Sequence, residues 1–125
     1  MTVYISGPIS HQPDGNRDAF SAAQVYFEAQ GHTVLNPHVF CKELERTLSA
    51  MDLTDDEKWH YFMRACIREV TKAHQLFALD GWNDSRGAMR EVAVAEWLGI
   101  PVRYQTPPTN AAPRFQGVVH EWVKS

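Results

Sequence analysis

Short apolar runs alternate along this chain with longer stretches in which apolar and polar residues are mixed. The short runs are rich in β-branched and aromatic residues, and two of them end at the turn-forming pairs Gly7-Pro8 and Asn36-Pro37, as strands do. Four strands are therefore expected, at residues 2–6, 33–35, 75–79 and 101–104.

The longer stretches have the spacing of amphipathic helices. Phe20, Ala23 and Phe27 recur on one side of the first stretch, and Gly31 follows as a stop signal. Helices are expected at about residues 16–30, 55–73 and 85–98, with a weaker helical pattern over residues 39–50.

This alternation is typical of a parallel sheet, because each parallel connection must cross back over the sheet. We therefore expect an α/β fold, a small doubly wound sheet of the Rossmann or flavodoxin type with about four to five strands and helices on both faces. The length of 125 residues suits one domain, which we place at residues 1–105. Residues 106–125 are expected to form a Pro-rich arm and a terminal element packed on the same domain or on a partner subunit.

Charge and composition argue against several classes of function. Twelve basic and fifteen acidic residues give a formal net charge of −3, and the basic residues are scattered, which disfavours a nucleic-acid polymer as partner. The six histidines lack the spacing of metal ligands, so we expect no metal or other cofactor. Neither a secretory segment nor an apolar run near 18 residues is apparent, so we expect a cytoplasmic protein without membrane contact and with free thiols at Cys41 and Cys66.

The turn before the last expected helix has the features of an anion site. Ligands of open α/β sheets bind beyond the carboxyl ends of the strands, where this turn lies. Ser85 can cap the helix, and Gly87 in its first turn would let a phosphate approach the free backbone N–H groups. The same two residues are also compatible with an ordinary helix cap and a glycine required by packing.

Glu91 lies on the apolar side of the same helix. Projected at 100° per residue, it falls with Ala88, Val92 and Ala95, so its side chain should turn towards the sheet. Burial of a carboxylate is costly unless a partner or a chemical task compensates. Glu91 is therefore either a structural carboxylate or a reactive one.

Three further side chains have two interpretations each. Tyr4, near the end of the first strand, can orient a carboxylate through its hydroxyl or serve as a core aromatic. Trp82 can stack on a nucleobase or cover the core. Cys66 lies on the apolar side of its helix with no histidine beside it in sequence, which favours a buried, unreactive thiol over a nucleophile.

Several short motifs at the expected strand ends and helix starts form a set. They are Val3 through Ile9, Asn36-Pro37, Tyr61 through Arg64, Gly81 through Ala88 with Glu91 and Ala95, and Leu98 through Val102. With these motifs, residues 2–104 resemble the nucleoside 2-deoxyribosyltransferase-like superfamily, and within it a short bacterial and phage branch of unknown function. The spacing Ser85-x-Gly87-x-x-x-Glu91 followed by Leu-Gly-Ile-Pro is the most specific part.

The resemblance implies a chemistry for these residues. In that superfamily a glutamate at the position of Glu91 attacks the anomeric carbon of a deoxyribosyl group, with a tyrosine at the position of Tyr4 beside it. Six positions before the glutamate the transferases carry an aspartate, whereas deoxynucleoside 5′-monophosphate N-hydrolases carry a serine that helps to hold the phosphate, as Ser85 would here. The residues then expected to bind substrate are Ser6, Gly7, Pro8, Ile9, Asn36, Gly81, Trp82, Ser85 and Gly87.

One position departs from the family pattern. Where relatives carry an aspartate in Met-Arg-x-Asp, which handles the proton of the leaving base, this chain has Cys66. General acid assistance is typically worth about 10²–10⁴ in rate, so its loss would matter. The sequence offers four possible substitutes without placing any of them near the site: Asp55, Asp56, His60 and His74.

The expected function is cleavage or transfer of the N-glycosidic bond of a (deoxy)nucleoside 5′-monophosphate through a glutamate nucleophile. Two alternatives stay open at this point: a catalytically impaired nucleotide-binding protein of the same fold, and an enzyme that acts on another ribosyl compound such as a dinucleotide. Relatives build part of their pocket from a neighbouring subunit, so the resemblance also implies at least a homodimer.

Overall fold

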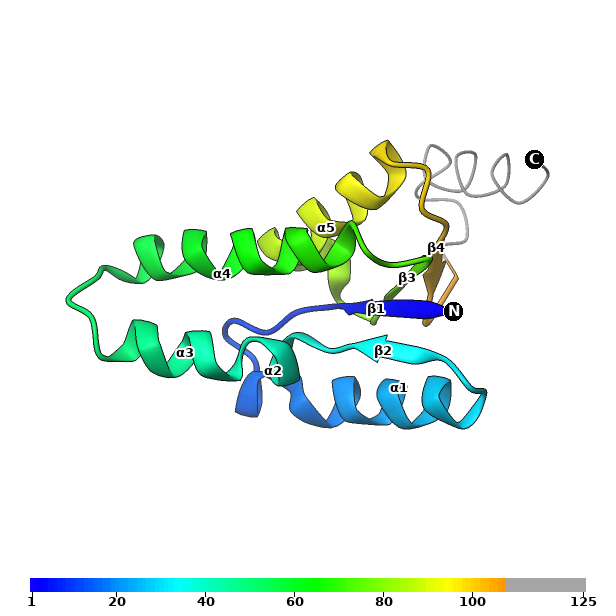
Figure 1. Ribbon diagram of the computed structural model, residues 1–125, viewed down its shortest axis with the longest axis horizontal. Coiled ribbons are helices and arrows are strands. Elements are labelled where there is room, and N and C mark those ends of the chain that lie inside the picture. The colour runs from blue at the N-terminus through cyan, green and yellow to red at the C-terminus, as the bar shows by residue number, and fades with distance from the viewer. Residues whose placement is uncertain (108–125) are drawn as a thin grey trace.

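A four-stranded parallel sheet forms the centre of the protein. The computed structural model describes residues 1–107 (Figure 1). The strands are β1 (Thr2–Ser6), β2 (Thr33–Leu35), β3 (Gln75–Ala78) and β4 (Val102–Tyr104). Their order in the sheet is β2-β1-β3-β4, and all three pairings are parallel. The expected α/β class is confirmed, with four strands.

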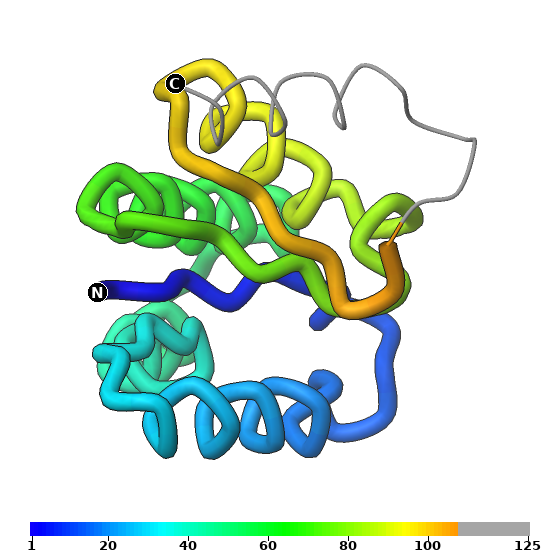
Figure 2. The backbone as a smooth tube through the Cα atoms, turned by 90° about the vertical axis from the view of Figure 1, so that its right-hand side faces the viewer, coloured from blue at the N-terminus to red at the C-terminus, as the bar shows by residue number. Residues whose placement is uncertain are grey.

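Helices cover both faces of this sheet. Helix α1 (Arg17–Ala29) lies on one face, and α4 (Asp55–Val70) and α5 (Arg86–Trp97) lie together on the other (Figure 2). Helices α2 (Pro37–Phe40) and α3 (Lys42–Ser49) connect β2 to α4, and two short 3₁₀ turns, η1 (Pro13–Asn16) and η2 (Trp82–Asp84), precede α1 and α5.

The core divides between the two faces because successive side chains of a strand point in opposite directions. Tyr4 of β1 belongs to the cluster under α4 and α5, whereas Ile5 packs with Phe20 of α1. Both strand residues are fully buried, as expected of a central parallel strand. The direction of Tyr4 sends its side chain towards α5, where the candidate site lies.

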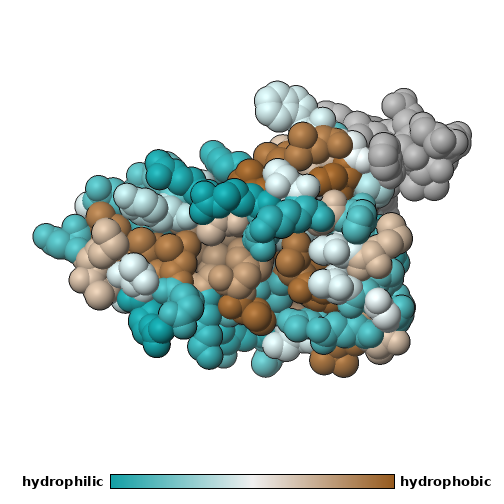
Figure 3. All heavy atoms as spheres, viewed as in Figure 1, coloured by the Kyte–Doolittle hydropathy of each residue, from teal (hydrophilic) through white to brown (hydrophobic). Residues whose placement is uncertain are grey.

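Helices α3 and α4 run beyond the end of the sheet as an antiparallel pair (Figure 1). Leu44 is partly buried and Leu48 is buried at their contact, and Figure 3 shows apolar side chains gathered between the two helices. Among residues 1–107, no helix is long and apolar enough to span a bilayer.

The structure refines several sequence-based boundaries. The weak helical pattern over residues 39–50 becomes two helices separated at Cys41, because Asn36 caps a short helix that begins at Pro37. Helix α4 ends at Val70, three residues earlier than expected, and the other elements shift by one or two residues at most. Most of the arm expected at residues 106–125 lies outside the described residues, so that assignment stays a prediction.

Candidate active site

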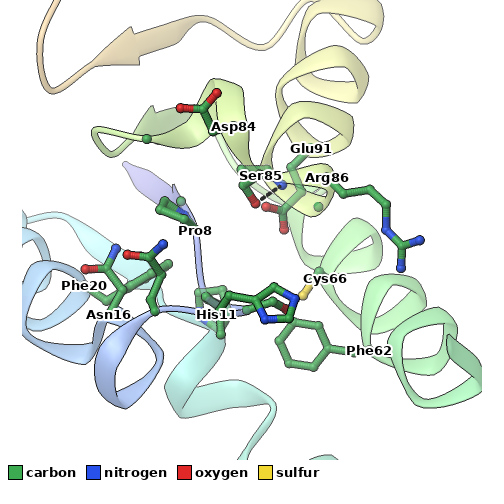
Figure 4. A pocket seen from close by; sticks show the side chains of 18 of the residues that line it. Pro8, His11, Asn16, Phe20, Phe62, Cys66, Asp84, Ser85, Arg86 and Glu91 are labelled. Carbon is green, nitrogen blue, oxygen red and sulfur yellow. Dashed lines mark hydrogen bonds between the residues drawn. The ribbon is translucent and has the colours of Figure 1, made fainter. Parts of the chain in front are cut away.

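A cavity of about 660 Å³ lies at the carboxyl ends of β1 and β3 (Figure 4). These are the two central strands, from which the chain continues to opposite sides of the sheet. Ligands of open α/β folds occupy this place, because the loops after the two strands separate here. The walls come from the loop after β1, the loop after β3, the first turns of α5, and α4.

Glu91 forms part of this wall although it is only 5% exposed. Its Oε1 accepts a hydrogen bond of 2.7 Å from the Ser6 hydroxyl, and its Oε2 accepts one from the Tyr4 hydroxyl. Tyr4 and Ser6 are two residues apart on β1, so strand geometry alone puts both on the face that α5 covers. The predicted turn of Glu91 towards the sheet is confirmed, and so is its proximity to Tyr4.

Burial governs the protonation of this cluster. It raises the pKa of Glu91 to about 7, while hydrogen bonds from Tyr4, Ser6 and Cys66 act in the opposite direction. Burial, followed by the charge of Glu91, raises the pKa of Tyr4 well above its usual range. Tyr4 therefore remains a neutral donor, and Glu91 is a carboxylate that can be ionised near neutral pH.

Cys66 lies against the same carboxylate. It is 1% exposed, and its interactions with Glu91 and Tyr4 bring it to the cavity wall. A hydrogen bond with Cys41, followed by burial and the nearby charge of Glu91, raises the pKa of the Cys66 thiol. The expectation of a buried thiol is confirmed, and its environment disfavours the thiolate that a nucleophilic cysteine requires.

The start of α5 faces the cavity. The Ser85 hydroxyl accepts a 3.2 Å hydrogen bond from the Ala88 N–H and keeps its own hydrogen for donation. The N–H groups of Arg86 and Gly87 belong to the first turn of the helix, which has no preceding carbonyls to bond. Ser85, Arg86 and Gly87 all line the cavity. Ser85 therefore caps α5, and the positive N-terminal end of the same helix is also suited to an anion.

Close packing also explains the glycines of this site. A Cβ on Gly87 would lie 3.2 Å from the Met63 sulfur, so the close approach of α4 to α5 favours glycine there. A Cβ on Gly7 would lie 2.9 Å from the Leu79 side chain. Gly81 has a φ of 88°, and a Cβ on it would lie 3.1 Å from Pro8. Gly7, Pro8 and Gly81 thus bring the two strand-end loops together along the cavity.

Three of the residues expected to bind substrate lie outside the lining: Ser6, Asn36 and Trp82. Asn36 accepts a hydrogen bond from the His38 N–H and donates one to Gln24 Oε1, so its amide holds α2 against α1. Trp82 packs against Tyr104 with ring centroids 5.4 Å apart and covers part of the core. Ile9 lines the cavity, and Ser6 reaches it through Glu91.

Several lining residues were not among those expected to form the site. Trp59 and Phe62 of α4 supply an aromatic wall, and the Arg86 guanidinium stacks over the Trp59 ring at 3.5 Å from its centroid. His11 comes from the loop after β1 and Asn16 from the end of η1, both with a φ of 63°. No periodic pattern marks loop residues, so only tertiary structure could identify the last two.

Within the described part of the chain, no group of three or more histidine, cysteine, aspartate or glutamate side chains is arranged to hold a metal ion. The polar side chains on the cavity lining include those of Glu91, Ser85, His11 and Arg86.

Comparison with known proteins agrees with the architecture. The fold is similar to the solved structure of a 2-deoxyribosyltransferase from the psychrotolerant bacterium Bacillus psychrosaccharolyticus, with a TM-score of 0.62 and 19% sequence identity over 87% of this chain and 77% of that one. No curated protein matches the sequence. A family model described as "Domain of unknown function (DUF4406)" matches residues 1–104, and the chain therefore belongs to that family.

Proposed function

We propose that this protein cleaves or transfers the N-glycosidic bond of a (deoxy)nucleoside 5′-monophosphate, with Glu91 as nucleophile. The observation that carries the proposal is the buried carboxylate of Glu91 at the cavity wall, bonded by the hydroxyls of Tyr4 and Ser6. The fold similarity to a 2-deoxyribosyltransferase supports the same class of chemistry.

The hydrogen bonds suit Glu91 to covalent catalysis. Each oxygen accepts one hydroxyl donor, so the carboxylate is fixed in orientation while lone pairs remain for the cavity. In the proposed reaction, one oxygen of Glu91 attacks C1′ of the sugar and the C1′–N bond breaks, with its electron pair leaving on the base. Water or an acceptor base then attacks C1′ of the resulting ester and frees the carboxylate.

The first turn of α5 supports a 5′-phosphorylated substrate. Ser85 and the first residues of the helix line the cavity, and the Arg86 guanidinium stacks on Trp59 nearby and pairs with Asp56 at 3.7 Å. Asp84 also lies on the lining, but Figure 4 shows its carboxylate directed away from Ser85 and Glu91. A hydrogen bond to a charged group contributes about 1.5–3 kcal/mol, so Ser85→Ala should weaken nucleotide binding about tenfold or more and change nucleoside binding little.

The test is the release of free base from a panel of nucleosides and nucleoside 5′-monophosphates, followed by chromatography, for three proteins. We expect base release from one or more monophosphates by the wild type, none by Glu91→Gln, and wild-type rates from His60→Ala. His60 is the matched control because it lies on α4, bonded to the Asp56 carbonyl and away from the cavity lining. Wild-type rates in Glu91→Gln would refute the nucleophile.

A second candidate is a nucleotide-binding protein of this fold that no longer catalyses the reaction. The observation that favours it is the protonated thiol of Cys66 against Glu91, because a thiol of raised pKa is a poor proton donor to a leaving base. Calorimetry separates the two candidates, since binding of a monophosphate without any base release over hours would support the second.

The choice between hydrolysis and transfer and the number of subunits are also part of the proposal. Adding a second free base to the assay distinguishes transfer, which forms a new nucleotide, from hydrolysis, which forms only a free sugar phosphate. We expect at least a homodimer, and a monomer at micromolar concentration in light scattering would contradict this.

A further inference from the structure

The proposed reaction requires a proton donor for the leaving base, and the residues suggested by sequence do not supply it. Asp55 and Asp56 lie in the first turn of α4, and His60 follows one turn later, with none of the three on the cavity lining. His74 lies before β3, where its Nδ1 accepts a hydrogen bond from the Thr2 N–H. All four are therefore away from Glu91.

His11 lies on the lining and comes from the loop between β1 and η1. Figure 4 shows its imidazole directed into the cavity, towards Cys66 and Phe62. Cys66 lines the cavity and contacts Glu91. The imidazole thus approaches the region beside Cys66 and Glu91 from the loop after β1.

The other ionisable groups on the lining are less suited to this step. Asp80, Asp84 and Arg86 come from the β3–α5 segment, on the side of the cavity where α5 begins. Arginine does not release its proton in proteins, and Figure 4 shows the Asp84 carboxylate directed away from Glu91. Histidine, in contrast, exchanges a proton readily near neutral pH.

We propose that His11 is the general acid and base of this site, an inference that rests on the proposed function. In the first step Glu91 forms an ester with C1′ while the C1′–N bond breaks, and the imidazolium of His11 donates its proton to the departing base. In the second step the neutral imidazole takes a proton from water as the water oxygen attacks C1′. The C1′–Glu91 bond breaks, which restores the carboxylate and the imidazolium and releases free base and sugar phosphate.

The backbone at His11 determines which variant gives a clean test. Its φ of 63° lies in the left-handed region, where asparagine is among the best tolerated residues other than glycine. His11→Asn therefore suits the loop conformation and keeps a polar side chain while removing the imidazole. The matched control is His60→Asn, the same change at a histidine outside the cavity.

The experiment compares two substrates that differ only in leaving group: a purine deoxynucleoside 5′-monophosphate, and 2-deoxyribose 5-phosphate carrying 4-nitrophenolate at C1. Purines need a proton to leave, whereas 4-nitrophenolate leaves as an anion. In the first turnover, before water attacks the ester, we expect His11→Asn to slow release of the purine about 10²–10⁴-fold and release of nitrophenolate less than about fivefold. His60→Asn should match the wild type with both substrates.

Equal slowing of the first turnover of both substrates by His11→Asn, or slowing of neither, would overturn the role of His11 and leave the proposed function standing. A wild-type protein inactive with both substrates would overturn the proposed function and this role with it. Glu91→Gln separates these cases, because loss of activity with both substrates in that variant shows that the reaction depends on the nucleophile regardless of the leaving group.

Discussion

Two buried polar residues at the carboxyl side of the sheet, Asn36 and Glu91, differ in what surrounds them. Asn36 is 4% exposed and Glu91 is 5% exposed, so burial alone does not distinguish them. The partners of Asn36 are the Gln24 side chain and the His38 backbone, close in sequence and outside the cavity. Those of Glu91 are hydroxyls of β1 more than eighty residues away.

The difference lies in what each residue gains from burial. The neutral amide of Asn36 gains a helix cap and a link to α1, which stabilises the fold at little electrostatic cost. The Glu91 carboxylate is harder to ionise because it is buried, and its hydrogen bonds only partly offset this effect. A buried ionisable group that borders a cavity, and whose charged form burial destabilises, is a candidate for chemistry. A buried amide whose hydrogen bonds all hold the fold together is not.

The largest expected effect on stability concerns the charge of Glu91. Its pKa rises from 4.5 to about 7 on folding, so the folded state resists ionisation. Below pH 4.5 Glu91 is neutral in both states; as pH rises to about 7 the unfolded state ionises first, and the fold loses on the order of 3 kcal/mol of stability. Glu91→Gln lacks this loss. Urea unfolding should be measured from pH 4 to 8. The free energy of unfolding of Glu91→Gln should rise relative to that of the wild type as the pH increases from 4.5 to about 7.

A constant stability difference between wild type and Glu91→Gln over that pH range would mean that Glu91 titrates normally. Glu91 would then be a structural residue like Asn36, and the contrast between the two residues would not hold.

The next effect concerns the hydroxyl of Tyr4. Tyr4→Phe keeps the buried ring and removes one donor to the Glu91 carboxylate, a bond of the charge-assisted kind worth about 1.5–3 kcal/mol. Because the donor stabilises the ionised form, its loss should lower kcat/KM for base release about tenfold or more and move the rising limb of the pH profile upward from about pH 7 by at least about one pH unit. The profile of kcat/KM against pH measures both changes.

An unchanged pH profile in Tyr4→Phe would show that this hydroxyl does not stabilise the reactive carboxylate. Tyr61→Phe is the control, since it removes a hydroxyl from a half-exposed tyrosine of α4 outside the cavity lining.

The smallest effect distinguishes the other residue of the comparison. Asn36→Ala removes the cap of α2 and the bond to Gln24, and should lower the free energy of unfolding by about 1–2 kcal/mol. Base release per folded molecule should stay at the wild-type rate, because Asn36 does not border the cavity. Loss of activity with unchanged stability would place Asn36 with Glu91 as a substrate-binding residue.

The spacing of apolar residues along the chain predicts the strands and helices of this protein better than it predicts which residues line the cavity. Strand and helix positions follow from apolar spacing, and the same projection turns Glu91 towards the sheet. The bond from Ser6 depends on how β1 meets α5, which spacing does not encode. Phe62 shows a second limit, because an apolar residue on the inner side of a helix can face either the core or a cavity.

Loop residues set a third limit. His11 lies on the cavity lining in a loop where its own backbone is left-handed, a conformation that apolar spacing does not predict. Trp82 is the opposite case. Its place in a strand-end motif is compatible with stacking on a base, but in the structure its ring packs on Tyr104. Resemblance to a family identifies which loops matter, while tertiary contacts decide which of their side chains face the ligand.

The central claim is that Glu91 forms a bond with the sugar, and a trapped intermediate tests it most directly. Wild-type protein is mixed with a reactive nucleoside monophosphate, quenched in acid within milliseconds to seconds, and analysed by intact mass and peptide mapping. The account predicts a transient adduct with the mass of the sugar phosphate on the peptide that contains Glu91, and none in Glu91→Gln. Base release by the wild type with no adduct at any quench time, or an adduct on another residue, would contradict it.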